Sequence, residues 1–67
     1  MTPNEIRAAR ATLGLSLDKL AAMLGYAGTF RKDQMHKLEI GTRDLMPCQE
    51  RLLRAYLAGY RPDDWPG

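Results

Sequence analysis

Residues Arg10 to Gly25, RATLGLSLDKLAAMLG, contain the end of one predicted helix, a tight connection and the whole of the next helix. Gly14 supplies a helix stop and Ser16 a helix N-cap, so one helix must end and another begin close together. The connection Gly14-Leu15-Ser16 is too short to let two helices separate, and they must therefore pack against each other. Leu15 is expected to fill the corner between them.

The helices on either side of this corner extend outward by local signals. Thr2 and Glu5 form a capping-box pattern and Pro3 suits a first helical position, which predicts a helix over residues 3–13. Its apolar residues recur at helical spacing and define one buried face: Ile6, Ala9 and Leu13. A second helix is predicted over residues 17–24 and ends at Gly25, with its apolar face at Leu17, Leu20, Ala21 and Leu24.

A third helix follows a turn of residues 25–29, which contains two glycines and no helical pattern. The helix is predicted over residues 30–40 and ends at Gly41. Met35 and Leu38 define its buried side at a spacing of three. The helical wheel then places a mostly polar and partly basic set on the opposite side: Asp33, His36, Lys37 and Ile40.

A fourth helix is predicted over residues 47–59, because Pro47 suits its first turn and Gly59 its end. Its apolar stripe is the most marked of the four and comprises Cys48, Leu52, Leu53, Tyr56 and Leu57. The tail, residues 60–67, contains two prolines and is expected to be extended or turned. The chain is therefore predicted to form one all-α domain, a compact four-helix fold with a short extended C-terminal tail.

The residue inventory argues against an enzyme. The 67-residue chain has one cysteine and one histidine, Cys48 and His36, so neither a disulfide nor a Cys/His metal site can form within it. Cys48 is interpreted as a small apolar core residue. No nucleophile-elbow serine or glycine-rich phosphate loop is present. We expect no catalytic activity, no cofactor, no metal and no small-molecule substrate.

The distribution of charged residues along the chain is more informative than the net charge. A net charge of +2 is shared by many proteins that bind no nucleic acid. Basic residues are concentrated in the middle of the chain, so that any basic face is central: Arg31, Lys32, Lys37 and Arg43. No apolar run reaches a membrane-spanning length, and the first residues lack the pattern of a signal peptide, so we expect a cytoplasmic protein without a membrane partner.

Two segments resemble the lambda-repressor-like helix-turn-helix family, which includes Cro proteins and XRE-like regulators of phages and bacteria. Residues 10–25, quoted above, resemble the first two helices of that family, and residues 38–43 (LEIGTR) resemble the end of its recognition helix. With the fourth helix, the resemblance covers nearly the whole chain. It implies a sequence-specific regulator that binds double-stranded DNA and places its third helix in the major groove.

The resemblance also implies which residues form the site. Family members read bases with the start and outer face of the third helix, which correspond here to Lys32, Asp33, Gln34, His36 and Lys37. DNA-backbone contacts would come from Ser16, Arg31, Thr42 and Arg43, with Thr29 and Tyr26 as additional candidates. A structural salt bridge is expected between Arg10 and Glu39, because both occupy otherwise core-facing positions.

The chain departs from the family pattern in two places. Leu17 stands where many members carry a polar residue that touches phosphate, so the second helix is expected to contribute mostly backbone contacts. The turn before the third helix is longer than usual by about four residues, close to one helical turn. If these residues loop out, Phe30 takes the place of the apolar residue usual before the helix; alternatively, Thr29 caps a lengthened helix. We favour a helix that starts near Phe30, with Arg31 reaching a phosphate.

The resemblance implies a homodimer on a palindromic operator, because two reading helices about 34 Å apart match two successive turns of the groove. The surplus of large apolar residues near the C-terminus predicts the dimer interface: Tyr56, Leu57, Tyr60 and Trp65. The alternative for Trp65 is that it folds back onto its own helix. Because no ligand-binding or catalytic domain is predicted, we expect the protein to regulate transcription through its concentration and the occupancy of its operator, as an autorepressor does.

The resemblance implies a phage or mobile-element origin for this protein, and such regulators include those associated with anti-CRISPR operons. Two other functions stay open at this point. One is the antitoxin of a toxin-antitoxin pair, although the usual toxin-binding extension is missing or very short here. The other is a protein-interaction module that keeps the fold without DNA binding and uses the aromatic tail as its interface.

Overall fold

Four α-helices make up the fold, which the computed structural model describes for residues 1–66. They are α1 (Pro3–Leu13), α2 (Leu17–Met23), α3 (Arg31–Ile40) and α4 (Pro47–Leu57), and this described part of the chain contains no strand. The predicted all-α class and four-helix architecture are confirmed. Helix α1 has the predicted bounds, and the others are one or two residues shorter than expected. Within residues 1–66, no helix has both the length and the apolar composition that crossing a bilayer requires.

Local capping determines where the first two helices begin and end. The Thr2 hydroxyl accepts a hydrogen bond from the Glu5 amide (3.2 Å), and the Glu5 carboxylate accepts one from the Thr2 amide (2.9 Å), as the capping-box pattern predicts. Gly14 ends α1 in the left-handed conformation, with φ at +70°. The Ser16 hydroxyl then caps α2 by accepting a backbone amide at 3.2 Å. Leu15 is buried in the corner, as expected.

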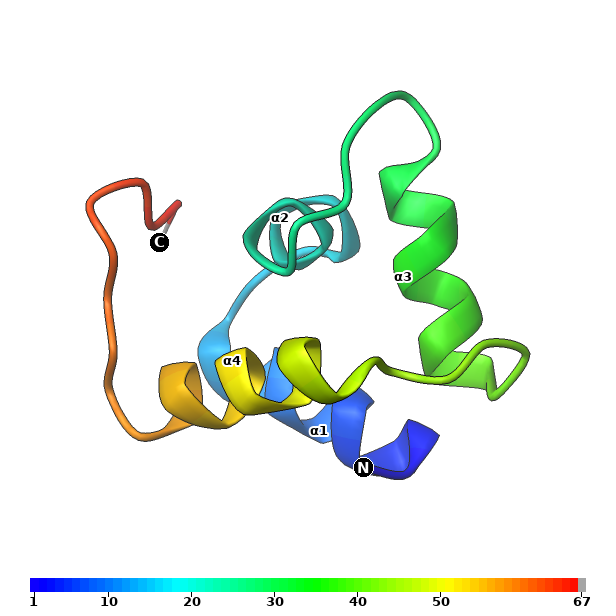
Figure 1. Cartoon of the computed structure of the whole chain (residues 1–67), viewed down its shortest axis with the longest axis horizontal. Coiled ribbons are helices and arrows are strands. Elements are labelled where there is room, and N and C mark those ends of the chain that lie inside the picture. Colours follow the sequence, from blue (N-terminus) through cyan, green and yellow to red (C-terminus); the bar gives the residue numbers. More distant parts are fainter. Residues whose placement is uncertain (67) are drawn as a thin grey trace.

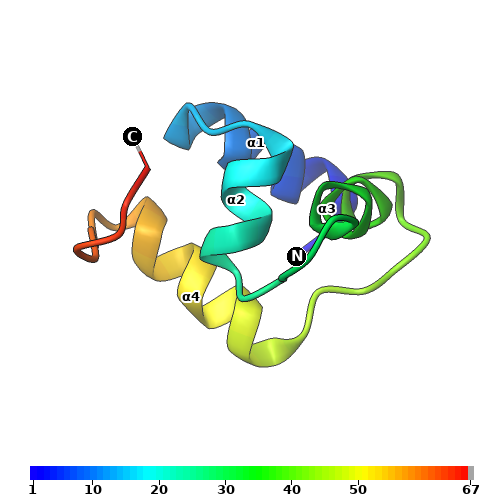
Figure 2. The same cartoon turned by 90° about the horizontal axis from the view of Figure 1, so that it is seen from above.

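Helices α1 and α4 lie together below α2 in the view of Figure 1, and α3 packs beside α2 (Figure 1, Figure 2). Helix α3 contacts both α2 and α1, and α4 contacts α1. All four helices and the corner contribute to a single core, which comprises Ile6, Ala9, Leu15, Leu20, Ala21, Met23, Leu24, Met35, Leu38, Leu53 and Tyr56. Because α3 packs at the edge of this group, one of its sides faces away from the core (Figure 2).

The buried face of α4 differs from the predicted one. Cys48 is exposed, so its interpretation as a core residue is wrong, and the next residue, Gln49, is buried. The amide of Gln49 tolerates burial because its nitrogen and its oxygen both have hydrogen-bond partners. Its Nε2 donates to the Leu24 carbonyl (3.3 Å), and its Oε1 accepts from the Met46 amide (3.1 Å) and the Tyr26 hydroxyl (3.3 Å). The buried apolar residues of α4 follow at helical spacing from Gln49: Leu53 and Tyr56.

The C-terminal tail folds back on α4. The Trp65 ring meets the Tyr56 ring edge-on, with centroids 5.0 Å apart. Tyr56 is itself only 2% exposed, and its hydroxyl donates to the Met23 carbonyl at 2.8 Å. The prediction that Tyr56 lies in a dimer interface is therefore wrong, because its side chain belongs to the core of one chain. For Trp65 the alternative, packing on its own helix, is the one observed, whereas Leu57 and Tyr60 stay exposed.

Candidate nucleic-acid interface

The outer side of α3 carries the predicted base-reading residues. Met35 and Leu38 face inward and are completely buried, which agrees with the side predicted from their spacing. The five candidates lie on the accessible remainder of the helix, three of them exposed and two half-buried: Lys32, Asp33, His36, Gln34 and Lys37. A single face of one helix therefore combines hydrogen-bond donors of positive charge, a carboxylate, an amide and an imidazole.

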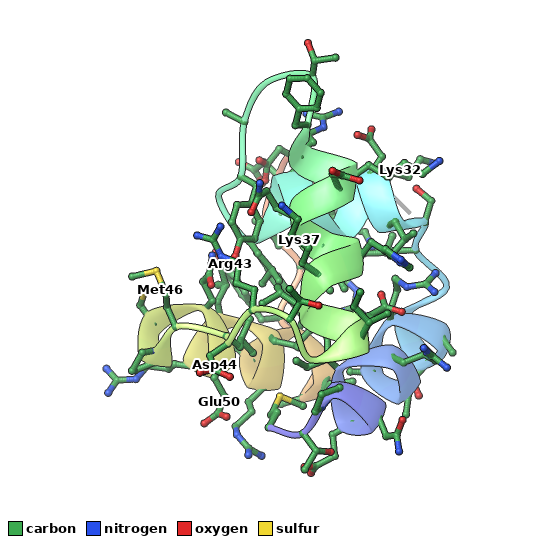
Figure 3. The ribbon with its side chains drawn as sticks, turned by 90° about the vertical axis from the view of Figure 1, so that its right-hand side faces the viewer. Lys32, Lys37, Arg43, Asp44, Met46 and Glu50 are labelled. Atoms are coloured by element: carbon green, nitrogen blue, oxygen red, sulfur yellow. The ribbon has the colours of Figure 1, made fainter. Side chains whose placement is uncertain are left out.

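Positive charges flank this face on both sides. Figure 3 shows Lys32 projecting from one side of α3, and Lys37 from the other side, toward Arg43. Within residues 1–66, the side chains of Lys32, Lys37, Asp33 and His36 enter no ion pair and no side-chain hydrogen bond. The ammonium groups can donate to phosphate oxygens or to guanine O6 and N7, and the carboxylate can accept from a cytosine amino group.

Arg43 is held beside α3 by two contacts. Its Nη1 donates a hydrogen bond to Oε1 of Gln34, and its guanidinium lies over the Tyr26 ring, 5.5 Å from the ring centroid. The Tyr26 hydroxyl in turn donates to Gln49 (3.3 Å). The prediction of Tyr26 as a phosphate ligand is therefore wrong, because its hydroxyl proton is used inside the fold. Its role is to support Arg43, whose remaining N–H groups face solvent at the edge of the α3 face.

Arg31, predicted to reach a phosphate, forms an ion pair within the chain, and the phosphate contact stays a prediction. Its Nε and Nη2 donate to the two carboxylate oxygens of Asp18, at 2.7 and 2.8 Å. These hydrogen bonds lower the pKa of the Asp18 carboxyl below its ordinary value and raise that of Arg31. The bidentate pair connects the beginning of α2 to the beginning of α3, so Arg31 helps to fix the position of α3.

The long connection between α2 and α3, residues 24–30, loops out. Helix α3 begins at Arg31, and Thr29 does not cap it, which agrees with the favoured alternative. Phe30, however, does not take the place of a buried apolar residue, because it is 72% exposed. Gly28, with φ at +89°, turns the chain just before it, and the Arg31–Asp18 pair occupies the junction between the two helices where an apolar contact was expected.

The expected Arg10–Glu39 salt bridge is present and ties α3 to α1. Arg10 donates from Nε to Glu39 Oε2 (2.7 Å) and from Nη2 to Oε1 (3.2 Å), and its Nη1 holds the Leu15 carbonyl (3.2 Å). Glu39 is 5% exposed, and Arg7 lies 3.7 Å from the same carboxylate. Because the pair bridges two helices far apart in sequence, it fixes where the C-terminal half of α3 sits.

The remaining backbone-contact candidates lie on exposed positions. Ser16 uses its hydroxyl oxygen to cap α2, which leaves the hydroxyl proton free to donate. Thr29 lies in the looped-out turn before α3, and Thr42 lies in the turn after it. These three residues stay predictions as phosphate contacts.

Sequence analysis missed a hollow at the N-terminal end of α3. The hollow has a volume of about 470 Å³ and is lined by residues from the starts of α2 and α3: Leu17, Thr29, Phe30, Lys32, Asp33 and His36. The roles of Asp18 and Gln49 were not predicted either. Gln49 lies three residues after Met46 and accepts its amide, and this spacing of a glutamine at the start of a helix was the one local signal for its position. The partners of Leu17 and Asp18 had no such local signal.

Among residues 1–66, no three potential metal-ligating side chains of His, Cys, Asp or Glu gather in one place. Comparison with protein-family models, with curated proteins and with solved structures finds no match to this chain.

Proposed function

We propose that this chain is a sequence-specific regulator that binds double-stranded DNA by laying the outer face of α3 in the major groove. The observation that carries the proposal is that α3 buries one side completely while its other side presents unpaired polar and cationic side chains, among them Lys32, His36 and Lys37. Ion pairs also fix α3 at both ends, through Arg31 to Asp18 at its start and through Glu39 to Arg10 at its end. A helix that is held in this way presents its outer face in a defined position, which recognition of a base sequence requires.

The dimensions of α3 suit the groove. Its ten residues make a rod of roughly 15 Å with a diameter of about 10–12 Å, and the major groove of B-form DNA is about 12 Å wide. In this placement Asp33 and His36, on the middle of the outer face, would meet base edges. Lys32 and Lys37, which project to either side, can reach bases or the phosphates of the two strands.

Backbone contacts would frame the reading helix. Arg43, held by Gln34 and Tyr26, presents a guanidinium at one edge of the α3 face. Ser16, at the start of α2, and Thr42, after α3, place small hydroxyl groups on the accessible surface around it. Such contacts set the register of the protein on the duplex without reading sequence.

A dimer remains part of the proposal, since one helix reads only a few base pairs. With Tyr56 and Trp65 packed inside the chain, the exposed apolar residues left at the end of α4 are Leu57 and Tyr60. Two copies joined through this end would present two copies of α3 to an operator with two-fold symmetry. Autorepression of the protein's own gene is the regulatory mechanism that we infer, with a phage or mobile element as its setting.

The direct test is a titration of the protein with DNA from immediately upstream of its own gene, against scrambled DNA, at two salt concentrations. In parallel, binding sites are selected from a random duplex library. We expect preferential, salt-dependent binding to the upstream DNA and enrichment of one symmetric motif. The variant Lys32→Ala/Lys37→Ala should lose most of this binding, whereas Arg51→Ala, which removes an exposed charge from α4, should retain it.

Equal or absent binding to every DNA sequence would contradict the proposal. The function would then have to be sought in protein interactions, for which Leu57 and Tyr60 offer the exposed apolar surface. An antitoxin would be distinguished by binding a toxin protein as well as its operator. The thermal unfolding of each variant, followed by circular dichroism, separates a lost contact from a lost fold.

A further inference from the structure

The hollow at the N-terminal end of α3 has apolar walls and a polar rim. Leu17, the first residue of α2, and Phe30, the residue before α3, line it together. Lys32, Asp33 and His36 complete the lining from the first turns of α3. Leu17, which departs from the family pattern in sequence, and Phe30 thus face the same space, on the side of the molecule that carries the candidate base-reading residues.

Phe30 is the most exposed large apolar residue of the described chain, with 72% of its surface accessible. Its backbone is nevertheless held in place, because its carbonyl accepts the Gln34 amide (3.1 Å) and Asp18 holds Nε and Nη2 of the neighbouring Arg31. An exposed aromatic ring forgoes the gain of burial, so a ring attached to this backbone at a surface hollow can gain that burial from a ligand.

The chemistry of the major groove limits what that ligand can be. Among the groups that base pairs display there, the thymine 5-methyl is the apolar one, and the others are hydrogen-bond donors and acceptors. We propose that Leu17 and Phe30 form a pocket for the 5-methyl group of a thymine, so that Phe30 is a specificity-determining residue. This inference depends on the proposed function, since it assumes that α3 enters the groove.

Charge supports DNA as the occupant of the hollow. Lys32 and Asp33 both lie on its rim, and Lys37 and Arg43 lie across α3 from it, so the wider surroundings of the apolar pocket carry a net positive charge and match a polyanion. The rim groups also match a base edge: the ammonium of Lys32 can donate to thymine O4, and Asp33 can accept the amino group of the paired adenine.

The test uses the DNA motif selected from the random library, resynthesised with deoxyuridine in place of thymidine at one position at a time. Uracil pairs as thymine does and lacks only the methyl group. We expect one position in each half-site at which the substitution weakens binding about fourfold, the effect of losing one buried methyl group. In the Phe30→Ala variant the preference for thymine over uracil should disappear, with an affinity ratio of about one, whereas Phe30→Leu should keep most of the preference.

A matched control comes from an exposed apolar residue outside α3. Met46 is 52% exposed at the start of α4, and Met46→Ala should leave the thymine preference unchanged. Specific binding that is indifferent to uracil at every position, or a preference that survives Phe30→Ala, would overturn the pocket while leaving the DNA-binding proposal intact. Failure to enrich any motif, with equal binding to all sequences, would overturn both.

Discussion

Replacing Arg10 with alanine is expected to destabilise the fold by about 2–4 kcal/mol. Removing one partner of a buried ion pair costs about 3–5 kcal/mol, because the other charge is left uncompensated. Glu39 is that charge, at 5% exposure, but the Arg10 side chain is 26% exposed and Arg7 stays 3.7 Å from the carboxylate, so the expected loss lies around the lower end of that range and extends below it. A domain of this size has a total stability of roughly 3–10 kcal/mol.

Thermal and urea unfolding, followed by circular dichroism, measure this loss, and each kcal/mol should lower Tm by about 4–8 °C. The matched control is Arg7→Ala, which removes a 59% exposed partner of the same carboxylate and should cost at most about 1 kcal/mol. A double-mutant cycle with Glu39→Gln should give a coupling energy above about 1 kcal/mol. Equal losses for Arg10→Ala and Arg7→Ala, or additive losses in the cycle, would refute the reasoning.

Four further predictions concern the interface and the packing around it. Lys37→Ala should weaken specific binding by about 1–3 kcal/mol and relax discrimination at one base position, whereas an equal loss on all DNA sequences would identify a phosphate contact. Arg43→Ala should weaken binding to every sequence and reduce the slope of log K against log salt by about one; an unchanged slope would place it outside the interface. The hydrogen bond from the N-terminal ammonium lowers the pKa of Glu50, so this contact stabilises the fold above the ordinary carboxyl pKa of 4.5 and loses its effect as the pH falls through the lowered value. Glu50→Gln should accordingly flatten the acid dependence of the unfolding free energy, and an unaltered dependence would contradict the contact. Gly41→Ala should lower the free energy of unfolding by about 1–2 kcal/mol because of the φ of +84°, and by more because the new Cβ would lie 3.3 Å from Pro3 Cγ. Urea unfolding should therefore show a larger loss than for Gly28→Ala, where no atom lies near the new Cβ.

The helices could be predicted because their signals are local. The capping bonds of Thr2 and Ser16 each join residues three apart, and Gly14 and Gly41 adopt the left-handed conformation at the residue that ends the helix. Such interactions form within one turn, so that the neighbouring residues are sufficient to specify them. The inner face of α3 was predictable for the same reason, because Met35 and Leu38 are its two strong apolar positions.

The face of α4 was not predictable from hydrophobicity. Cys48 and Gln49 are adjacent in sequence, and the apolar pattern favours burying the cysteine. The structure buries Gln49, because its amide bonds the Leu24 carbonyl, 25 residues away, and the Tyr26 hydroxyl, 23 residues away. A polar side chain becomes a core residue only when the fold supplies its partners, and those partners come from a turn with which α4 shares no local pattern.

The candidate site shows the same division. That α3 should carry the base-reading residues followed from the sequence and its family resemblance, and the Arg10–Glu39 pair followed from the resemblance together with the core-facing positions of both residues. Arg31 shows the limit, since no local signal indicated that Asp18, 13 residues earlier, would pair with its side chain. The looped-out turn likewise leaves Phe30 exposed, where its apolar character predicted burial.

Helix caps and apolar periodicity act over a few residues, so the number of helices, their bounds to within two residues and the polar side of α3 could be predicted from the sequence. The pairing of the charges, the burial of the Gln49 amide, the packing of Trp65 on Tyr56 and the hollow shared by Leu17 and Phe30 became apparent in the tertiary structure. Those features depend on how the helices are placed relative to one another, and many different side-chain pairings are compatible with the same pattern of helices.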